Sequence, residues 1–264
     1  MDIILVYLLI GIAVGVLAGL FGVGGGLVIV PALVFVFARL GFSAEVIVHL
    51  AVGSSLATII FTSISAIYAH HKRGAVLWTA CWQLTPGIIL GAALGAMLAD
   101  AMPGLLLRRV FAFFEWLVAA QLLLNIKPAA ARTLPGRAGM TAAGTVIGGV
   151  SSIIGIGGGT LTVPFLLWCN VLMQRAVATS SACGLPIAIA GSISFIFTGW
   201  NEMPILPAYA TGYVYWPAVL GITFTSVLFA PLGAALAHRL PAEKLRRNFG
   251  FFLIVLGAYM FAKA

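Results

Sequence analysis

Two stretches of the chain, GLFGVGGGLVIVP at residues 19–31 and SIIGIGGGTLTVP at residues 152–164, share one pattern. Each holds four glycines within five residues, followed five residues later by a proline. We call residues 22–26 the first glycine cluster and residues 155–159 the second glycine cluster. Glycine inside a helix costs roughly 1 kcal/mol relative to alanine, so a cluster that occurs twice requires a structural or functional reason.

The composition predicts an all-α polytopic membrane protein. Of the 264 residues 62% are hydrophobic and 8% are charged, whereas soluble domains carry about 25% charged residues. The N-terminus has an acid at Asp2 and lacks a basic n-region, so we expect a first membrane segment rather than a cleaved signal peptide. Cys81, Cys169 and Cys183 lie in apolar stretches without metal-ligand spacing. We therefore expect buried thiols, no metal and no cofactor.

The apolar runs predict about five membrane segments in each half of the chain. They are 3–20, 26–39, 46–68, 76–99, 108–126, 138–155, 160–173, 176–197, 213–237 and 246–263. A full span needs roughly 20 residues. Runs 26–39 and 160–173 are shorter, and each follows a glycine cluster directly. They are therefore either tilted spans or the return arms of re-entrant hairpins.

The basic residues indicate how the segments are oriented. If each half crosses the membrane an odd number of times, four basic residues share a side with the N-terminus and ten lie opposite. The four are Arg39, Arg108, Arg109 and Lys263. The ten are Lys72, Arg73, Lys127, Arg132, Arg137, Arg175, Arg239, Lys244, Arg246 and Arg247. An even number would divide them eight against six. Because cytoplasmic loops are enriched in Lys and Arg, we favour the odd count, periplasmic termini and two halves of inverted orientation.

Further blocks of sequence occur twice in the same order. LGAMLADAMPGLLLRRVFAFF at 94–114 aligns with LGAALAHRLPAEKLRRNFGFF at 232–252, and VGSSLAT at 52–58 aligns with ATSSACG at 178–184. Together with the glycine clusters these blocks indicate a duplication.

The duplication predicts one membrane domain with a first repeat at 1–126, a cytoplasmic linker at 127–137 and a second repeat at 138–264. Inverted repeats with interrupted helices at matching positions are typical of secondary transporters, whose substrate site lies near mid-membrane where the repeats meet. Non-helical backbone at that depth is tolerated only where it lines protein or a watery cavity.

Several quoted motifs resemble one known family. GxGGG followed by VP in both halves, GSSLATIIFTSISAIYAHHKRGAV and LTPGIILGAALGAMLAD are similar to the sulfite exporter TauE/SafE family, also called the toluene-sulfonate uptake permease family. The resemblance covers nearly the whole chain apart from residues 127–140 and the loop GWNEMPILPAY. It implies a multi-pass transporter of the bacterial inner membrane that moves sulfite, thiosulfate or organosulfonates such as sulfoacetate, often outward.

The resemblance also implies the partners of the chain. A small sulfur oxyanion and the lipid bilayer are expected, and the net charge of +8 is that of loops facing anionic lipid rather than nucleic acid. A homo-oligomer is possible.

Backbone N–H groups are the donors that this chain offers to an anion, because the predicted spans contain no clear lysine or arginine. A glycine-rich turn before a helix leaves the first N–H groups of the helix unpaired. Two such starts, brought face to face by the inverted repeats, could bind one anion. The candidate residues are Gly24, Gly25, Gly26, Gly157, Gly158, Gly159 and Thr160. The alternative is close helix packing, which we favour for Gly11, Gly15 and Gly19 and for Gly87, Gly91 and Gly95.

Hydroxyl groups lie at mid-span in both halves. They belong to Ser54, Ser55 and Thr58 in the first half and to Thr179, Ser180 and Ser181 in the second. They either contact the substrate or bond to backbone one turn earlier.

Three ionisable residues are further candidates. Glu115 is the one acid well inside a predicted span and is a candidate proton carrier, although its repeat equivalent is Leu253. It could instead be a hydrogen-bonded residue at a subunit contact. His49 and Arg175 each precede a serine pair by five residues, at segment ends on opposite faces. They either attract anions into a vestibule or anchor the helices at the membrane interface.

These features favour a secondary transporter of a small sulfur-containing anion, working by alternating access as an exporter. An anion channel and an importer of a related organic anion remain alternatives. We expect no enzymatic activity, because neither HExxH nor GxSxG occurs in the chain.

Overall fold

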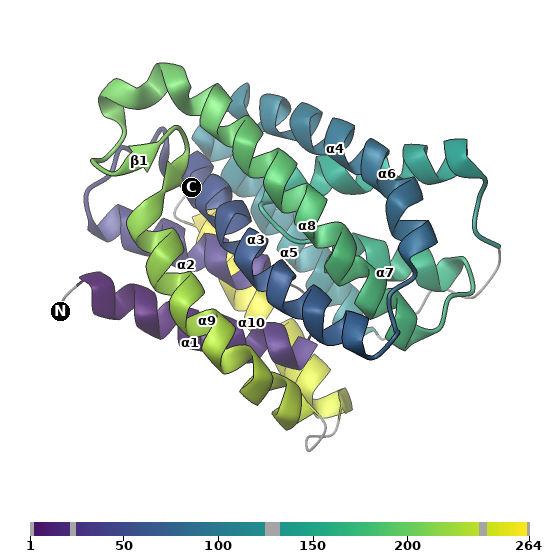
Figure 1. The fold of residues 1–264 in the computed structure, drawn as a ribbon. Helices are drawn as coiled ribbons and strands as arrows, with labels where there is room; N and C mark the ends of the chain where they lie inside the picture. Colours follow the sequence, from purple (N-terminus) through teal and green to yellow (C-terminus); the bar gives the residue numbers. More distant parts are fainter. Residues whose placement is uncertain (1–2, 22–24, 125–132, 238–241, 263–264) are drawn as a thin grey trace.

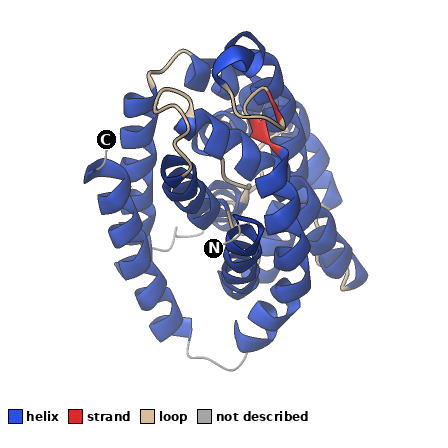
Figure 2. Cartoon of the chain, turned by 90° about the vertical axis from the view of Figure 1, so that its left-hand side faces the viewer, coloured by secondary structure: helices blue, strands red, loops and turns tan. Residues whose placement is uncertain are grey.

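The computed structural model describes residues 3–21, 25–124, 133–237 and 242–262. These residues are almost entirely helical (Figure 2), which confirms the all-α expectation. The first half holds α1 (Ile3–Phe21), α2 (Gly26–Arg39), α3 (Ile47–Lys72), α4 (Trp78–Asp100) and α5 (Gly104–Leu123). The second half holds α6 (Arg137–Ile154), α7 (Gly159–Trp168), α8 (Met173–Thr198), α9 (Trp216–Ala237) and α10 (Ala242–Ala262). Between α8 and α9 lie the 3₁₀ helix η1 (Gly199–Ile205) and a hairpin of β1 (Ala210–Thr211) and β2 (Val214–Tyr215).

Several helices suit a lipid environment. Among the described residues, α3, α4 and the stretch Met173–Ile205 are long and apolar enough to cross a membrane. Large apolar side chains such as Leu90, Leu94 and Leu98 on α4 are about half exposed on the surface of the bundle. Lipid tails would cover them, so the protein is embedded in a membrane.

Glycines allow α4 and α6 to pack along each other in the same direction. A Cβ atom at Gly87 or Gly91 of α4 would meet the carbonyl oxygen of Thr141 or Thr145 of α6. One turn further on, a Cβ at Gly95 would meet the backbone of Gly149. The four-residue glycine spacing therefore serves helix packing here, as in other small-residue seams.

The pair α1 and α9 repeats this arrangement. A Cβ at Gly11 would meet Ile222 and Thr225, and one at Gly15 would stand 2.5 Å from the carbonyl oxygen of Ser226. The two helices therefore also run in the same direction. The Thr225 hydroxyl donates to the Leu8 carbonyl oxygen across this seam, at 2.8 Å.

In contrast, α3 and α8 cross the centre of the bundle in opposite directions (Figure 1). Gly53, near the start of α3, lies against Phe195, near the end of α8. At the other end of the crossing, Gly184 of α8 lies against Ser63 of α3.

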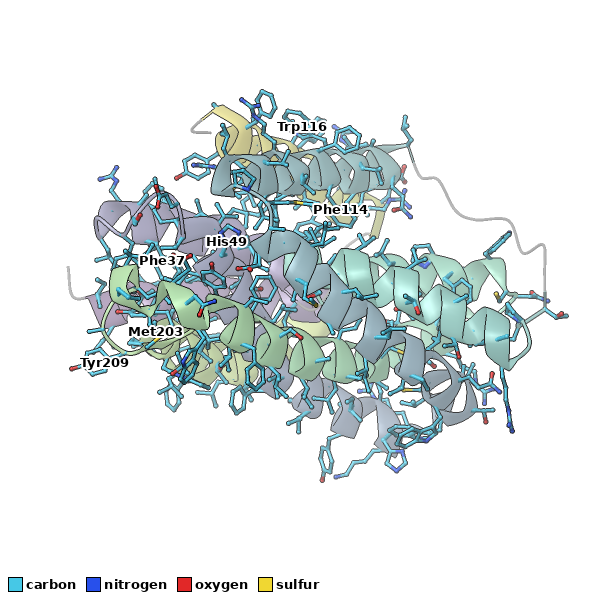
Figure 3. All side chains as sticks on the ribbon, turned by 90° about the horizontal axis from the view of Figure 1, so that it is seen from above. Phe37, His49, Phe114, Trp116, Met203 and Tyr209 are labelled. Carbon is cyan, nitrogen blue, oxygen red and sulfur yellow. The ribbon has the colours of Figure 1, made fainter. Side chains whose placement is uncertain are left out.

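Helices α5 and α10 are also antiparallel and form a layer along one side of the bundle (Figure 3). Gly257 of α10 packs on Trp116, whose indole Nε1 donates to the Ile254 carbonyl oxygen at 3.3 Å. Gly250 packs on Leu123 at the other end of the pair. Phe114 lies on the inner side of α5, toward the rest of the bundle.

The turns of the chain gather at two ends. At the end that we call the hairpin end, Gly104 lies against the Glu45 backbone, the Tyr213 N–H bonds to the Phe195 carbonyl, and the Arg108 guanidinium lies over the Tyr259 ring. Figure 1 places both termini and the hairpin in the same half of the molecule.

The basic residues divide unequally between these ends. Three of those described belong to helix ends at the hairpin end, namely Arg39, Arg108 and Arg109. Seven belong to the opposite end, namely Lys72, Arg73, Arg137, Arg175, Lys244, Arg246 and Arg247. The remaining four, Lys127, Arg132, Arg239 and Lys263, lie outside the described residues.

Two apolar runs differ from the helices they form. The run 213–237 begins in the hairpin, because Gly212 takes a φ of +52° and turns the chain before α9. The run 160–173 gives a helix of only 10 residues, since α7 ends before Asn170, which takes a φ of +61°. At 1.5 Å per residue α7 is about 15 Å long and the 14-residue α2 about 21 Å, against roughly 30 Å of hydrocarbon. Neither is long enough to span a bilayer alone.

Candidate functional site

The two glycine clusters lie against each other inside the bundle. A Cβ at Gly26 would stand 2.6 Å from the Gly155 carbonyl oxygen and 2.8 Å from the Ile156 Cα. Gly25, Gly26, Gly155 and Ile156 are all buried. The start of α2 is therefore in contact with the turn between α6 and α7, although 133 residues separate the clusters in sequence.

The first glycine cluster forms the start of α2. Gly25 takes a left-handed conformation with a φ of +78°, and its carbonyl oxygen accepts from the N–H groups of Val28 and Ile29 at 2.9 and 3.0 Å. The N–H groups of Gly26 and Leu27 belong to the first helical turn, where N–H groups have no acceptor carbonyl within the helix. Gly24, a predicted site residue, lies outside the described residues.

The second glycine cluster ends α6 and starts α7. Gly155 takes a φ of +74° and its carbonyl oxygen accepts from the Ser55 hydroxyl of α3 at 2.7 Å. The first bond of α7 runs from the Thr162 N–H to the Gly158 carbonyl oxygen at 2.8 Å. The N–H groups of Gly159 and Thr160 thus lie in the first turn of α7, where a helix offers free donors and positive potential.

Two predicted hydroxyls hold the starts of other helices. The Tyr215 N–H, just before α9, donates to the Ser54 hydroxyl of α3 at 2.9 Å. The Leu77 N–H, just before α4, donates to the Thr179 hydroxyl of α8 at 2.9 Å. A side chain of α3 therefore caps the start of α9, and a side chain of α8 caps the start of α4. Each half thus supplies one such cap to a helix of the other half.

The other predicted hydroxyls differ in what they contact. Ser180 and Ser181 bond to the Val177 carbonyl oxygen of their own helix at 2.8 and 3.1 Å. Ser55 reaches a glycine cluster, through Gly155.

Sequence reasoning missed a set of hydroxyls near the second glycine cluster. Their oxygens are buried and have no hydrogen-bond partner among the described residues. They belong to Ser151, Ser152, Thr162 and Ser192, and the hydroxyl of the predicted Thr160 shares this state. The matching positions of the first half carry no hydroxyl groups, so a comparison of the two halves of the sequence does not single these residues out. A sequence signal exists at Thr162, since the matching position of the first stretch is Ile29.

Glu115 is fully buried in α5, and neither carboxylate oxygen has a hydrogen-bond partner among the described residues. The neighbouring Trp116 pairs with Ile254 of α10, and the equivalent residue of that helix, Leu253, is also fully buried. The acid therefore lies in the packed region between the α5–α10 layer and the rest of the bundle.

His49 and Arg175 lie at opposite ends of the protein. His49 Nε2 donates to the carbonyl oxygens of Ala99 and Met102 at 3.0 and 3.2 Å, and its ring stacks on Tyr213 at 5.1 Å between centroids (Figure 3). Burial, followed by the Asp100 carboxylate, raises the pKa of Tyr213. Arg175 is exposed in the first turn of α8.

The described residues offer little to a metal. No group of three His, Cys, Asp or Glu side chains among them is arranged to hold a metal ion. Cys81, Cys169 and Cys183 are buried and form no disulfide.

Comparisons with known proteins agree on one family. Residues 7–260 match the family described as sulfite exporter TauE/SafE. A probable membrane transporter protein of Haemophilus influenzae is 39% identical over 98% of both chains. Probable membrane transporter proteins of Methanocaldococcus jannaschii and Bacillus subtilis (YunE) are 28% and 26% identical over more than nine-tenths of each chain. No solved structure matches. The chain therefore belongs to the sulfite exporter TauE/SafE family of membrane transporters.

Proposed function

We propose that this protein is a secondary transporter that exports a small sulfur-containing anion, such as sulfite, thiosulfate or sulfoacetate, by alternating access of two inverted repeats. The observation that carries the proposal is the contact between the two glycine clusters at the starts of two short helices inside the bundle.

The directions of the helix pairs support the inverted repeats. A two-fold axis in the membrane plane would exchange α1 with α6, α2 with α7, α3 with α8, α4 with α9 and α5 with α10. It requires α3 and α8, and likewise α5 and α10, to be antiparallel, as they are. It also requires the α1–α9 and α4–α6 pairs to be alike, and both are parallel and joined by glycine seams. The repeats would be residues 1–126 and 138–264, joined by the linker 127–137.

The glycine clusters are suited to hold an anion between the repeats. First-turn N–H groups and the positive ends of α2 and α7 supply attraction without a buried cation. Interrupted helices whose N-termini point at an anionic group are the usual site of such transporters. The short lengths of α2 and α7 support re-entrant arms, each returning to the side from which its glycine cluster was reached.

The distribution of basic residues supports periplasmic termini in a bacterial inner membrane. Three of those described lie at the hairpin end and seven at the opposite end, which would be cytoplasmic. An anion leaving a cell that is negative inside gains about 2.3 kcal/mol per charge for each 100 mV. Export therefore needs no coupled ion.

Glu115 is the candidate for any coupled proton. It is the buried carboxylate among the described residues, and an intramembrane acid is by default a functional candidate. His49 and Arg175 would contribute to the entrances at the two ends, where the anion is solvated.

The experiment that tests the function is counterflow in liposomes. Proteoliposomes loaded with unlabelled sulfite or thiosulfate should accumulate the ³⁵S-labelled anion transiently, and the rate should saturate with concentration. Unitary currents without counterflow would indicate an anion channel. Uptake driven only toward the cytoplasmic side would indicate an importer. Absence of flux with every sulfur anion would overturn the substrate class.

A further inference from the structure

We propose that the anion site is one-sided: the oxyanion binds at the second glycine cluster, to the hydroxyls of Thr162, Thr160 and Ser63 and to the first-turn N–H groups of α7. The first glycine cluster packs against this turn and contributes shape but few donors. This inference rests on the proposed transport of a sulfur oxyanion and names the residues that bind it.

Thr162 is the central residue of this site. Its side chain is fully buried, and its Oγ1 has no hydrogen-bond partner among the described residues. The same oxygen lies 3.1 Å from where a Cβ at Gly158 would be, and Gly158 is the N-cap of α7. A buried hydroxyl without a partner is destabilising, so a ligand that accepts from it gains a favourable hydrogen bond. A ligand oxygen above Gly158 would accept from both the hydroxyl and the helix start.

Ser63 of α3 lies near the same helix start, over Gly184 of α8. Ser63 is 7% exposed, and its Oγ lies 3.2 Å from where a Cβ at Gly184 would be. The Gly158 nitrogen lies 3.6 Å from that same point. Glycine at 184 therefore keeps open the space that Ser63 shares with the start of α7.

The first glycine cluster lacks these donors. Ile29 occupies the position of Thr162, and its Cδ1 lies 3.6 Å from where a Cβ at Gly25 would be. In both halves, the side chain four residues after the capping glycine thus lies over that glycine. The group is an apolar methyl of Ile29 in the first half and the hydroxyl of Thr162 in the second. Each cluster also has a carbonyl oxygen beside it, that of Gly155 against Gly26 and that of Ser180 against Gly158, so the hydroxyls are what distinguishes the second cluster.

The donors of the second glycine cluster suit a small oxyanion with at least three equivalent oxygens. Hydroxyl and amide donors form charge-assisted hydrogen bonds to anionic oxygen. Because none of these donors carries a full charge, binding buries no ion pair, and the anion can be released when the repeats move. Sulfite, thiosulfate and sulfonate groups all present three equivalent oxygens on sulfur, the first two as dianions when deprotonated and the sulfonates as monoanions.

A second group of hydroxyls extends from this site along α8. Ser152 Oγ lies 3.2 Å from where a Cβ at Gly191 would be, next to Ser192. Gly184 and Gly191 are seven residues apart, about 10 Å along the helix. These unpartnered hydroxyls therefore mark the direction in which an anion would leave Thr162.

The test compares binding by matched variants of the full chain in lipid nanodiscs. ³⁵S-sulfite and ³⁵S-thiosulfate are titrated against the wild type, Thr162→Val, Thr162→Ser and Ser63→Ala. The control is Thr58→Val, which removes a buried hydroxyl that bonds to the Ser54 carbonyl within α3. We expect Thr162→Val to weaken binding about 10- to 100-fold, Ser63→Ala about tenfold, and Thr162→Ser and Thr58→Val less than about threefold.

The outcomes separate this inference from the proposed function. Wild-type binding that Thr162→Val leaves unchanged overturns the one-sided site, while transport of sulfur anions stands. Equal loss in Thr162→Val and Thr162→Ser also overturns it, because the hydroxyl would then not be the donor. Absence of binding and flux in the wild type with both anions rejects the proposed function itself. Thermal midpoints of the variants, measured without anion, identify any variant that loses binding by unfolding.

Discussion

The first and second glycine clusters share their backbone pattern and differ in the side chains around it. Gly25 and Gly158 each start a short helix, and residue 29 or 162 covers each of them. That residue is isoleucine in the first half and threonine in the second. A carbonyl oxygen lies beside each cluster, but apolar groups surround the first and buried hydroxyls lie near the second.

In the proposed transporter, this difference is how two related halves would hold a single ligand. The shape that lets two helix starts meet is needed twice, because the repeats must pack on each other. Donors are needed only where the anion binds, so the side chains of the other copy are free to become apolar packing.

Gly25→Leu and Gly158→Leu are expected to abolish transport, lowering flux more than about 100-fold. A side chain at Gly25 is strained at a φ of +78° and would meet Val14, and one at Gly158 would stand 3.0 Å from the Ser180 carbonyl oxygen. Counterflow in proteoliposomes measures the effect. Gly136→Ala is the control, because a Cβ there meets nothing within 4 Å. Unchanged flux in both leucine variants would reject a site at the helix starts.

Glu115→Gln is expected to reduce the stimulation of flux by a pH gradient about tenfold, because an amide cannot carry a proton. Flux driven by the membrane potential alone should change less than about threefold. The measurement compares ³⁵S-sulfite export with and without an imposed pH gradient. Glu45→Gln, which alters an exposed acid, serves as the control. A pH response that survives in Glu115→Gln would show that this carboxylate is not the proton carrier.

Ser54→Ala and Thr179→Val should each destabilise the protein by about 1 kcal/mol, because each removes the acceptor of one helix-start N–H. Thermal or urea unfolding of the detergent-solubilised protein measures the change. Similar losses in the two variants are expected, because each removes one cap at the start of a helix. A large loss of anion affinity with unchanged stability would instead make these hydroxyls substrate ligands.

Ile29→Thr should change anion affinity by less than about twofold, although it gives the first glycine cluster the side chain of the second. Leu27 would still occupy the position that Thr160 has in the second cluster, so the first cluster would gain only one of the donors. Titration of the variant with ³⁵S-sulfite in lipid nanodiscs measures this affinity. An affinity gain of about tenfold would indicate that both clusters bind the anion equally.

The sequence predicted most of the helices and the meeting of the glycine clusters. Apolar runs such as 46–68 and 76–99 correspond to α3 and α4 within a few residues. The hairpin was not predicted, because its residues continue an apolar run and are turned only by Gly212. The family was recognised from ordered motifs, and the match over residues 7–260 confirms it.

The binding hydroxyls were harder to predict, because the duplicated ones drew attention. Ser54 and Thr179 each cap the start of a helix, although in the aligned blocks Ser54 matches Ser180 and Thr179 matches Gly53. Thr162 is near Gly158 because both belong to the start of α7, whereas Ser63 comes from α3 and reaches this region only through folding. The composition of the sequence and the spacing of its residues do not predict such contacts between distant segments.

The inverted relation of the two halves is tested most directly by labelling the starts of α3 and α8 from each side of the membrane. Glu45→Cys and Gln174→Cys place a single thiol at exposed positions near the starts of α3 and α8, in a chain whose Cys81, Cys169 and Cys183 are replaced by alanine. A membrane-impermeant maleimide should label Glu45→Cys only from the periplasmic side and Gln174→Cys only from the cytoplasmic side. Labelling of both positions from the same side would contradict the inverted repeats and the shared site between them.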